Sequence, residues 1–422
     1  MKKRIWLWNH YATGMAISRT GRHYWFARFL KEMGYEPVIF CANTFHGSHD
    51  SVVVQDGRYH EELVSDIPFV FVKTTEYKGN GIDRLMNVGL FFRNLFPVAK
   101  EYARKKGRPD AILASSVHPL TMVAGIQVAR KLSVPCICEV RDLWPESLVA
   151  YKGMSRGNPL TQALYHGEKW IYANADLLIF TMEGGKDYII GHKWDKDNGG
   201  PVDLDKVYHI NNGFDLEEFD INREVNVFSD HDLDDPELFK FVYAGSIRPA
   251  NNLGLILSAA KHLPQTLKNK IKILIFGDGL EREALEERCS IEGISSVVFK
   301  GHVSKKYIPS ILEKANATVL NYTNHDIWKY GGSQNKLFEY LAAGRPVLST
   351  IQMGYDVISR YRAGISAENQ KPETIAQAMM TLASLEPNEY QQMCQNARRA
   401  AMEYDVRVLA RRLIDCLQVV LS

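Results

Sequence analysis

Short apolar runs rich in β-branched residues alternate along the chain with stretches of helical periodicity. This alternation is typical of a parallel sheet covered by helices. In the first half, strands are predicted at Arg4–Trp8, Pro37–Cys41, Phe69–Val72, Ala111–Ser115, Pro135–Val140 and Leu177–Thr181. Helices are predicted between them, including Gly21–Met33, Arg84–Lys106, Leu120–Leu132 and Leu160–Asn174.

The same alternation starts again after residues 192–205, a stretch rich in Gly, Asp and Lys that indicates a loop near a domain boundary. Second-half strands are predicted at Val207–Ile210, Phe239–Ala244, Ile271–Phe276, Val297–Lys300, Ala317–Leu320 and Pro346–Ser349. Helices are predicted near Asn252–His262, Leu280–Cys289, Lys305–Ala315 and Asn335–Ala343. The fold class is therefore α/β, with two doubly wound, Rossmann-like domains. Ligands of such sheets bind beyond the carboxyl ends of the strands, so we expect a site that draws on both halves.

Length and composition fit this organisation. The chain has 422 residues, 45% hydrophobic and 24% charged, which allows two domains with separate cores. A net charge of +2 gives no strong overall field and does not suggest nucleic acid binding. The first apolar run ends at Asn9, too early for a signal peptide, and no run approaches the roughly 20 residues that span a bilayer. We expect a cytoplasmic protein whose membrane contact, if any, is peripheral, and its six cysteines show no disulfide or zinc spacing.

Residues 328–347 carry the strongest chemical signal. Gly331, Gly332 and Ser333 lead into the predicted helix that starts at Asn335, and a helix N-terminus offers unpaired N–H groups and a positive dipole end to a diphosphate. Lys336 adds a full charge in the first turn, and Glu339 can accept hydrogen bonds from a ribose. The alternative is that the glycines only form a turn and a cap.

Other predicted strand ends in the second half carry matching signals. Gly245 allows a close backbone approach, and Ser246 and Arg248 offer donors to a phosphate. Gly277 and Val303 follow the next two strands. The predicted donor-binding residues are Gly245, Ser246, Arg248, Gly277, Val303, Tyr330, Gly331, Gly332, Ser333, Asn335, Lys336 and Glu339.

Charged and polar residues also follow two strands of the first half. His118 comes after the strand Ala111–Ser115, directly before Pro119, where it should face the cleft. A structural or surface histidine is the alternative. Arg141, Asp142 and Glu146 follow the next strand, and a structural salt bridge is the open alternative for them.

Several segments resemble one enzyme family. Residues 338–347, Phe-Glu-Tyr-Leu-Ala-Ala-Gly-Arg-Pro-Val, resemble the most recognisable stretch of the family-four retaining glycosyltransferases. Asn211–Asp215, Gly277–Gly279 and Gly301–Val303 resemble further landmarks of that family, in its order. Residues 139–147 resemble a bacterial subgroup that builds surface polysaccharides and includes the fucosamine transferase WbuB. The resemblance implies a GT-B fold, with an acceptor-binding domain over 1–205, a donor nucleotide-binding domain over 206–403, and a helix over 404–422 that returns to the first domain.

The resemblance also implies an activity. It implies transfer with retention from a nucleotide-diphosphate sugar, UDP-linked by family habit, to a carbohydrate or polyprenol-linked acceptor, with no metal and no other cofactor. His118 matches the histidine that the family places against the donor sugar, and Asp142 and Glu146 become catalytic candidates that position the acceptor hydroxyl. Gly331 and Ser246 depart from the family pattern, which usually has a glutamate and a basic residue there.

The acceptor side is assigned by the same resemblance. Gly21, Arg22 and His23 resemble the family's glycine loop, and Arg141 is added to this acceptor-binding set. Two other functions stay open, a sugar-nucleotide epimerase on the same double-Rossmann fold and a non-catalytic protein that only binds nucleotide sugars.

The predicted helix 84–108 suggests one further partner. It interleaves Phe91, Phe92 and Phe96 with Arg93, Lys100, Arg104, Lys105, Lys106 and Arg108. Aromatic and basic residues on one helix suit an anionic membrane surface. An ordinary amphipathic helix with a solvated basic end is the alternative, and the polyprenol-linked acceptors of the family favour membrane contact.

Overall fold

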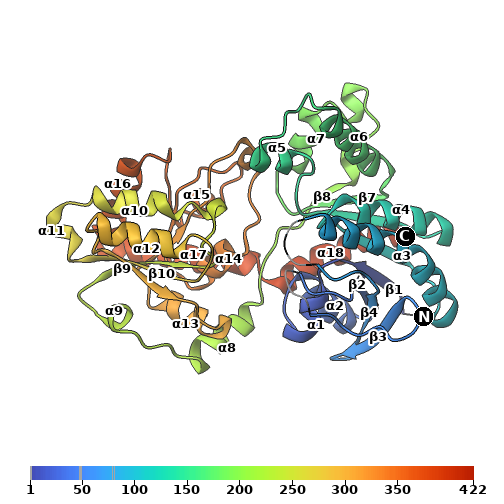
Figure 1. Ribbon diagram of the computed structural model, residues 1–422, viewed down its shortest axis with the longest axis horizontal. Helices are drawn as coiled ribbons and strands as arrows, with labels where there is room; N and C mark the ends of the chain where they lie inside the picture. The colour runs from blue at the N-terminus through green and yellow to red at the C-terminus, as the bar shows by residue number, and fades with distance from the viewer. Residues whose placement is uncertain (1, 47–49, 78, 80) are drawn as a thin grey trace. The chain divides into compact units, whose positions relative to one another are not determined.

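The protein consists of two compact α/β units. A computed structural model describes residues 2–46, 50–77, 79 and 81–422. Unit 1 comprises Met1–Asn211 with Val406–Ser422, and unit 2 comprises Asn212–Asp405. Each unit has a sheet with helices on its faces (Figure 1). The predicted α/β fold class with two Rossmann-like domains is confirmed.

Unit 1 contains an eight-stranded sheet in the order β3-β4-β2-β1-β5-β6-β7-β8. The strands are β1 (Arg4–Trp8), β2 (Glu36–Ala42), β3 (Tyr59–Val64), β4 (Ile67–Val72), β5 (Ala111–Ser115), β6 (Cys136–Val140), β7 (Leu177–Phe180) and β8 (Val207–His209). The helices are α1 (Thr13–Ser18), α2 (Arg22–Glu32), α3 (Ile82–Lys106), α4 (Pro119–Leu132), α5 (Glu146–Lys152), α6 (Pro159–Asn174), α7 (Gly185–Gly191) and α18 (Val406–Leu421). The strands pair in parallel except β3, which is antiparallel to β4.

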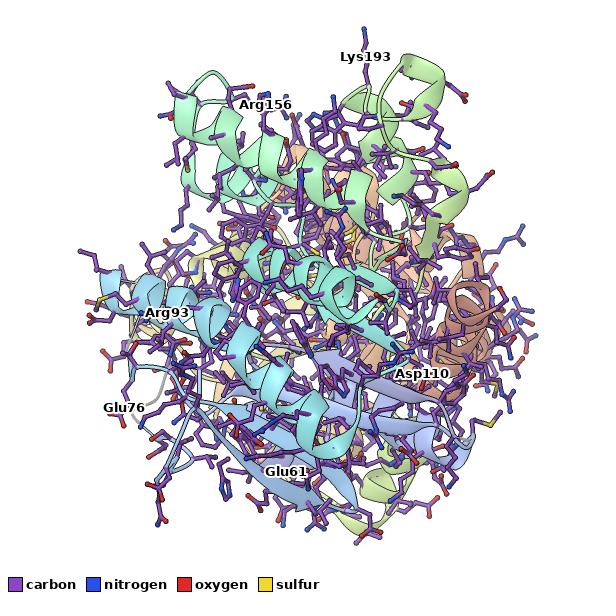
Figure 2. The ribbon with its side chains drawn as sticks, turned by 90° about the vertical axis from the view of Figure 1, so that its right-hand side faces the viewer. Glu61, Glu76, Arg93, Asp110, Arg156 and Lys193 are labelled. Carbon is purple, nitrogen blue, oxygen red and sulfur yellow. The ribbon has the colours of Figure 1, made fainter. Side chains whose placement is uncertain are left out.

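Alternation along β1 shows how the sheet of unit 1 is covered. Successive side chains of a strand point to opposite faces. Leu7 joins the core that α2 and α18 complete, whereas Trp6 lies 5.8 Å from the ring of Tyr102 on α3. Helix α3 packs beside α4 (Figure 2). The final helix of the chain therefore belongs to unit 1, as the predicted return of 404–422 requires.

Unit 2 contains a six-stranded parallel sheet in the order β11-β10-β9-β12-β13-β14. The strands are β9 (Phe239–Ala244), β10 (Ile271–Phe276), β11 (Val297–Gly301), β12 (Ala317–Leu320), β13 (Val347–Ser349) and β14 (Gly364–Ser366). The helices are α8 (Leu216–Val225), α9 (His231–Asp234), α10 (Leu253–Lys261), α11 (Gln265–Lys268), α12 (Arg282–Ile291), α13 (Ile308–Glu313), α14 (Asn335–Ala342), α15 (Val357–Tyr361), α16 (Pro372–Ala383) and α17 (Pro387–Glu403). Its core joins the inner faces of β9 and β10 to α10 and α16.

Two predicted elements need correction, and two edge strands, β3 and β14, were not predicted. The strand predicted at Val207–Ile210 was assigned to the second sheet, but β8 pairs with β7 in unit 1, because residues 192–205 return the chain to that sheet edge. The edge strand β3 was missed, since its largely exposed residues give no apolar run. The single helix predicted at Lys305–Ala315 is a 3-10 turn, η4 (Lys305–Tyr307), followed by α13. No helix among the described residues is long and apolar enough to cross a membrane.

Candidate functional site

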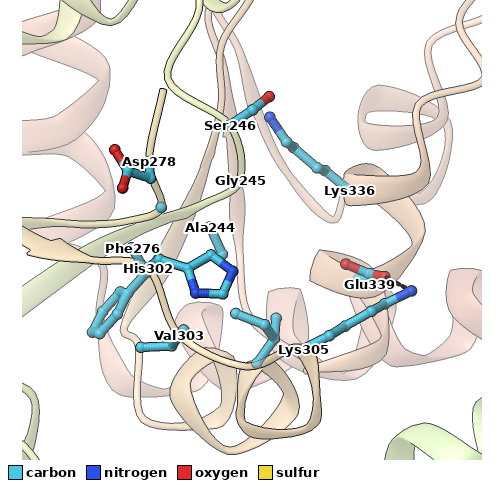
Figure 3. Close-up of a pocket in the computed structure, with 12 residues that line it drawn as sticks. Ala244, Gly245, Ser246, Phe276, Asp278, His302, Val303, Lys305, Lys336 and Glu339 are labelled. Atoms are coloured by element: carbon cyan, nitrogen blue, oxygen red, sulfur yellow. Dashed lines mark ion pairs between the residues drawn. The ribbon is translucent and has the colours of Figure 1, made fainter. Parts of the chain in front are cut away.

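A pocket of about 370 Å³ lies at the carboxyl ends of β9, β10 and β11 in unit 2 (Figure 3). Helix α14 supplies its polar wall. The lining residues are Ala244, Gly245, Ser246, Phe276, Gly277, Asp278, His302, Val303, Lys305, Ile308, Lys336 and Glu339. This is the edge of a parallel sheet at which ligands of doubly wound folds bind.

Glycine is required where β9 and β10 end. The N–H of Gly245 donates to the carbonyl of Phe276 at 2.9 Å, and the N–H of Gly277 donates to the carbonyl of Gly301 at 2.8 Å. A Cβ on Gly277, whose φ is +151°, would overlap the carbonyl of Gly245. A Cβ on Gly245, whose φ is +154°, would overlap the side chain of Lys336. The missing side chains therefore let the strand ends and Lys336 meet closely.

Lys336 reaches the pocket from the first turn of α14. Its Nζ donates to Oη of Tyr243 at 2.6 Å and lies 4.4 Å from the Tyr243 ring centroid and 5.4 Å from that of Tyr322. Burial and then the nearby charge of Arg248 lower the pKa of Lys336 to about 7, while Glu339 opposes the shift. A bound anion would restore the charge of this side chain.

Glu339 lies three residues further along α14. Its Oε1 is 3.8 Å from Nζ of Lys305, the ion pair drawn in Figure 3. Burial raises the pKa of this carboxyl, and Lys305 and Lys336 act against that rise. The side chain offers acceptor oxygens at the pocket wall, as a ribose would need.

The N-terminus of α14 has no side-chain cap. Gln334 is the N-cap residue and makes no capping hydrogen bond with its side chain. The predicted ligand Ser333 is engaged otherwise, since its Oγ accepts from the N–H of Asn212 at 3.0 Å and its carbonyl accepts from Nδ2 of Asn212 at 2.9 Å. The N–H of Leu337 donates to the carbonyl of Gln334 at 3.0 Å, whereas those of Asn335 and Lys336 precede the first hydrogen bond of the helix and can meet an anion, as at other helix N-termini.

Six of the twelve predicted donor-binding residues line the pocket together: Gly245, Ser246, Gly277, Val303, Lys336 and Glu339. The other six, Arg248, Tyr330, Gly331, Gly332, Ser333 and Asn335, lie outside the lining. Arg248 is nevertheless near it, because its Nε donates to Oγ of Ser246 at 3.1 Å. Six lining residues were not predicted: Ala244, Phe276, Asp278, His302, Lys305 and Ile308. The first five stand at or just after predicted strand ends or at a predicted helix start.

In unit 1 a buried charge network joins β6 to the start of α2. Glu139 accepts from Nε of Arg22 at 2.7 Å and from Oγ of Ser115 at 2.7 Å, and lies 3.0 Å from Nε2 of His23. Burial opposes ionisation, but Arg22 and His23 hold the pKa of Glu139 well below its ordinary value. Arg22 also donates to the carbonyls of Asn211 and Ile210, at 2.6 and 2.8 Å.

These contacts bear on the predicted acceptor-binding residues. Arg22 and His23 are buried and direct their polar groups into the protein, because Glu139 needs cationic or donor partners in the interior. Gly21, the N-cap of α2, has a φ of +108° and permits the turn before them. Arg141 donates its backbone N–H to Oγ of Ser116 at 2.9 Å, and its Nε is buried with no hydrogen-bond partner among the described residues.

The predicted catalytic residues occupy different settings. His118 is the N-cap of α4 at the end of β5 and is only 6% exposed, and its Nε2 lies 2.6 Å from Nδ1 of His10. Asp142 is exposed just after β6. Glu146 is buried, and both of its oxygens accept hydrogen bonds, one from Arg156 and one from Tyr165 on α6. Glu146 thus ties α5 to α6.

No group of three or more metal-ligating side chains is present in the described part of the chain.

Two family models match the chain. Residues 22–199 match the Glycosyl transferase 4-like domain, and residues 239–384 match Glycosyl transferases group 1. The first segment lies in unit 1 and the second in unit 2. No curated protein matches the sequence.

Similar solved structures cover 97% or more of the chain. A sucrose-phosphate synthase from Thermosynechococcus elongatus is 16% identical over 99% of both chains, with a TM-score of 0.72. HepE of Anabaena, in complex with UDP and glucose, is 13% identical over 99% of this chain and 100% of that one, with a TM-score of 0.64. WaaG, a glycosyltransferase involved in lipopolysaccharide biosynthesis, is 12% identical over 97% of this chain and 98% of that one, with a TM-score of 0.64. At these identities the likeness shows the two-domain GT-B fold.

Proposed function

This chain belongs to the group 1 glycosyltransferases, and from that premise we propose that it transfers a sugar from a UDP-sugar to a carbohydrate or polyprenol-linked acceptor, with retention at the anomeric carbon. The observation that carries the proposal is the pocket of unit 2, where Lys336, Glu339 and the uncapped start of α14 converge. The HepE structures with UDP, with UDP and glucose, and with UDP-glucose support a uridine nucleotide as the ligand.

The pocket would act mainly by electrostatics. When the bond from the sugar to the diphosphate breaks, negative charge grows on the diphosphate. Lys336 and the first N–H groups of α14 are already in place to meet that charge, so little reorganisation is needed. Glu339 would hold the ribose. The reaction then needs no metal or other cofactor.

Residues of unit 1 would serve the sugar and the acceptor. We assign His118 to the transferred sugar, because a buried imidazole at a strand end retains one nitrogen without a hydrogen-bond partner among the described residues. Asp142 is the exposed carboxylate that can orient an acceptor hydroxyl, and Arg141 adds a positive charge beside it. Glu146 is left out of this assignment because Arg156 and Tyr165 occupy its oxygens.

The proposed biological role is the synthesis of a bacterial surface polysaccharide. The resemblance of residues 139–147 to that subgroup supports it, as does the similarity to WaaG, which is involved in lipopolysaccharide biosynthesis. Such acceptors are often lipid-linked, and we propose that α3 brings the enzyme to the membrane surface. The exposed apolar side chains Ile82, Leu85 and Met86 support this contact.

Ligand binding by calorimetry tests the proposal. We expect UDP to bind, and Lys336→Ala and Glu339→Ala each to lose about 1.5–3 kcal/mol of binding free energy, typical of a charge-assisted contact. Lys306→Ala is the matched control, since Lys306 is an exposed lysine outside the pocket lining. Unchanged affinity in both pocket variants would refute the assignment. An epimerised nucleotide formed from a UDP-sugar without any acceptor would favour the epimerase instead.

A further inference from the structure

A chain of buried hydrogen bonds runs behind His118 in unit 1. Nε2 of His118 lies 2.6 Å from Nδ1 of His10, and Nε2 of His10 lies 2.7 Å from Oδ1 of Asn87 on α3. The amide of Asn87 in turn donates to the carbonyl of Thr75, and to Oγ1 of Thr44 at 3.0 Å. The ring of His10 stacks on Phe91 at 4.3 Å between centroids, which fixes its plane.

The carbonyl of Thr75 fixes which atom donates and which accepts in each hydrogen bond between Asn87, His10 and His118. A backbone carbonyl can only accept, so the group of Asn87 that faces it must be the NH₂. The opposite group of Asn87 is then the carbonyl oxygen, which can also only accept. Nε2 of His10 must therefore carry a hydrogen and donate it to Asn87.

His10 is neutral, so its other nitrogen is a bare acceptor. Burial, followed by the neighbouring His118, lowers the pKa of His10 well below its ordinary value, and the Asn87 bond opposes that shift only in part. The titratable groups around this ring are His118 at the N-cap of α4, Arg84 on α3, His46 after β2 and Tyr11 after β1. A neutral His10 with a hydrogen on Nε2 has a lone pair on Nδ1, which can only accept from Nε2–H of His118.

Nδ1 of His118 is the nitrogen at which this series of hydrogen bonds ends. Burial and the charge of Arg84 lower the pKa of His118 to about 3, so this ring too is neutral at physiological pH. With its hydrogen on Nε2, Nδ1 holds only a lone pair. That nitrogen is buried and has no hydrogen-bond partner among the described residues. Most buried polar groups are hydrogen-bonded, so this unpaired acceptor suits a donor group that a ligand brings.

We propose that Asn87 and His10 are positioning residues that hold His118 in its Nε2–H tautomer, so that Nδ1 accepts a hydrogen bond from a hydroxyl or amide N–H of the transferred sugar. The inference rests on the proposed function, since it takes a sugar to be what meets His118. It also defines a specificity. A donor sugar without a hydrogen-bond donor at that position leaves Nδ1 buried and unpaired, and sites of this kind reject such analogues strongly.

The tautomer can be read directly in the ligand-free enzyme. Protein labelled with ¹⁵N-histidine gives distinct NMR signals for protonated and bare ring nitrogens, and His118→Gln identifies the signals of His118 by their loss. We expect a bare Nδ1 and a protonated Nε2 on His118 from pH 5.5 to 8. A hydrogen on Nδ1, or an imidazolium in this range, would overturn the inference.

Asn87→Asp tests the role of the relay in turnover. A carboxylate at position 87 raises the pKa of His10, and a protonated His10 donates from both nitrogens. Nε2 of His118 must then accept, which moves its hydrogen to Nδ1. We expect the NMR signals to show a protonated Nδ1 and a bare Nε2 on His118. The rate of UDP release from UDP-glucose or UDP-N-acetylglucosamine should fall at least about tenfold at pH 6.5, while the affinity for UDP is kept. Turnover should recover as the pH rises through the raised pKa of His10 and the ring becomes neutral again.

Asn94→Asp is the matched control. Asn94 is a buried residue of the same helix that donates to the carbonyl of Lys73 at 2.7 Å and touches neither histidine of the relay. This variant should lose stability in a similar way but keep wild-type turnover per folded molecule. Equal turnover in the two aspartate variants would overturn the inference. A wild-type enzyme that neither binds UDP nor releases it would instead refute the proposed function, while the NMR signals still decide the tautomer.

Discussion

At the scale of single residues, Lys336 combines two roles in one position. It fills the space left by Gly245 and lies against Tyr243, so its ammonium is partly withdrawn from water before any ligand arrives. Its pKa of about 7 means that free enzyme at neutral pH is divided between the charged and uncharged forms. A diphosphate favours the charged form and raises the pKa again, so binding above pH 7 must take up a proton.

This linkage makes the affinity for UDP-glucose depend on pH. We expect the affinity to be highest near pH 6 and to weaken between pH 7 and 9, by at most about tenfold for each pH unit. Lys336→Met should bind more weakly at pH 6 and show no such dependence, whereas the exposed control Lys306→Met should behave as wild type. Calorimetry in two buffers with different ionisation enthalpies measures the proton uptake. A wild-type affinity that is flat from pH 6 to 9 would contradict the role given to Lys336.

The residues that sequence could identify are those whose chemistry is local. Gly245, Lys336 and Glu339 stand in patterns of a few residues, a glycine after a strand or a charge in a first helical turn, and the structure brings them into one pocket. The buried contact between Arg22 and Glu139 joins residues 117 positions apart in the sequence, so no local pattern predicts it. The relay from Asn87 to His118 is of the same kind, because α3, β1 and α4 meet only in the folded sheet.

At the scale of elements, apolar runs predicted the inner strands and the edge strand β11 well, whereas the edge strands β3 and β14 were missed. The predicted strands Arg4–Trp8 and Phe239–Ala244 have the bounds found for β1 and β9, because both lie inside a sheet and are apolar on both faces. The edge strand β3 has few buried residues and gave no signal. For β8 the apolar run was predicted but was assigned to the wrong sheet, because the sequence of a three-residue strand does not show which strand it pairs with.

The side chains that are exposed on α3 differ from those predicted to contact a membrane. Phe91 was predicted to contact a membrane, but it is fully buried against His10 and cannot do so. Phe92 and Phe96 are half-buried and pack edge to face on each other. The apolar side chains that remain open are Ile82, Leu85 and Met86, which are 74%, 70% and 52% exposed. Arg93 and the basic C-terminal end of α3 are exposed further along (Figure 2).

We expect α3 to bind anionic vesicles through both of its exposed parts. Leu85→Ser with Met86→Ser should reduce co-sedimentation with vesicles that contain phosphatidylglycerol, because less apolar surface enters the interface. Arg104→Glu with Lys105→Glu and Lys106→Glu should reduce it mainly at low salt, since each basic residue contributes about 1 kcal/mol near an anionic surface. Leu63→Ser with Ile17→Ser, two exposed apolar side chains outside α3, is the control. Equal binding by all variants would remove α3 as the contact.

At the scale of the whole molecule, the two units differ in how the chain builds them, since unit 1 comprises two segments and unit 2 comprises one. Unit 1 needs two separate segments, because α18 supplies Leu409, Leu413 and Leu417 to the core under α2. Unit 2 is one continuous segment, Asn212–Asp405, with its own sheet and core. Its ends are joined, since the N–H of Phe214 donates to the carbonyl of Tyr404 at 3.3 Å and the N–H of Leu216 to Oδ2 of Asp405 at 3.2 Å.

The proposed division of labour predicts that residues 212–405 fold alone and bind UDP without catalysing transfer. Every lining residue of the nucleotide pocket lies within this segment, so its affinity for UDP should stay within about threefold of the full chain, a difference below 1 kcal/mol. It should release no UDP from UDP-glucose, because His118 and Asp142 belong to the part removed. Calorimetry and a thermal melt measure binding and folding, and Lys336→Ala in the same segment is the control that should weaken UDP binding by about 1.5–3 kcal/mol, as expected in the full chain. A segment that melts cooperatively yet fails to bind UDP, while the full chain binds it, would mean that residues of unit 1 complete the nucleotide site.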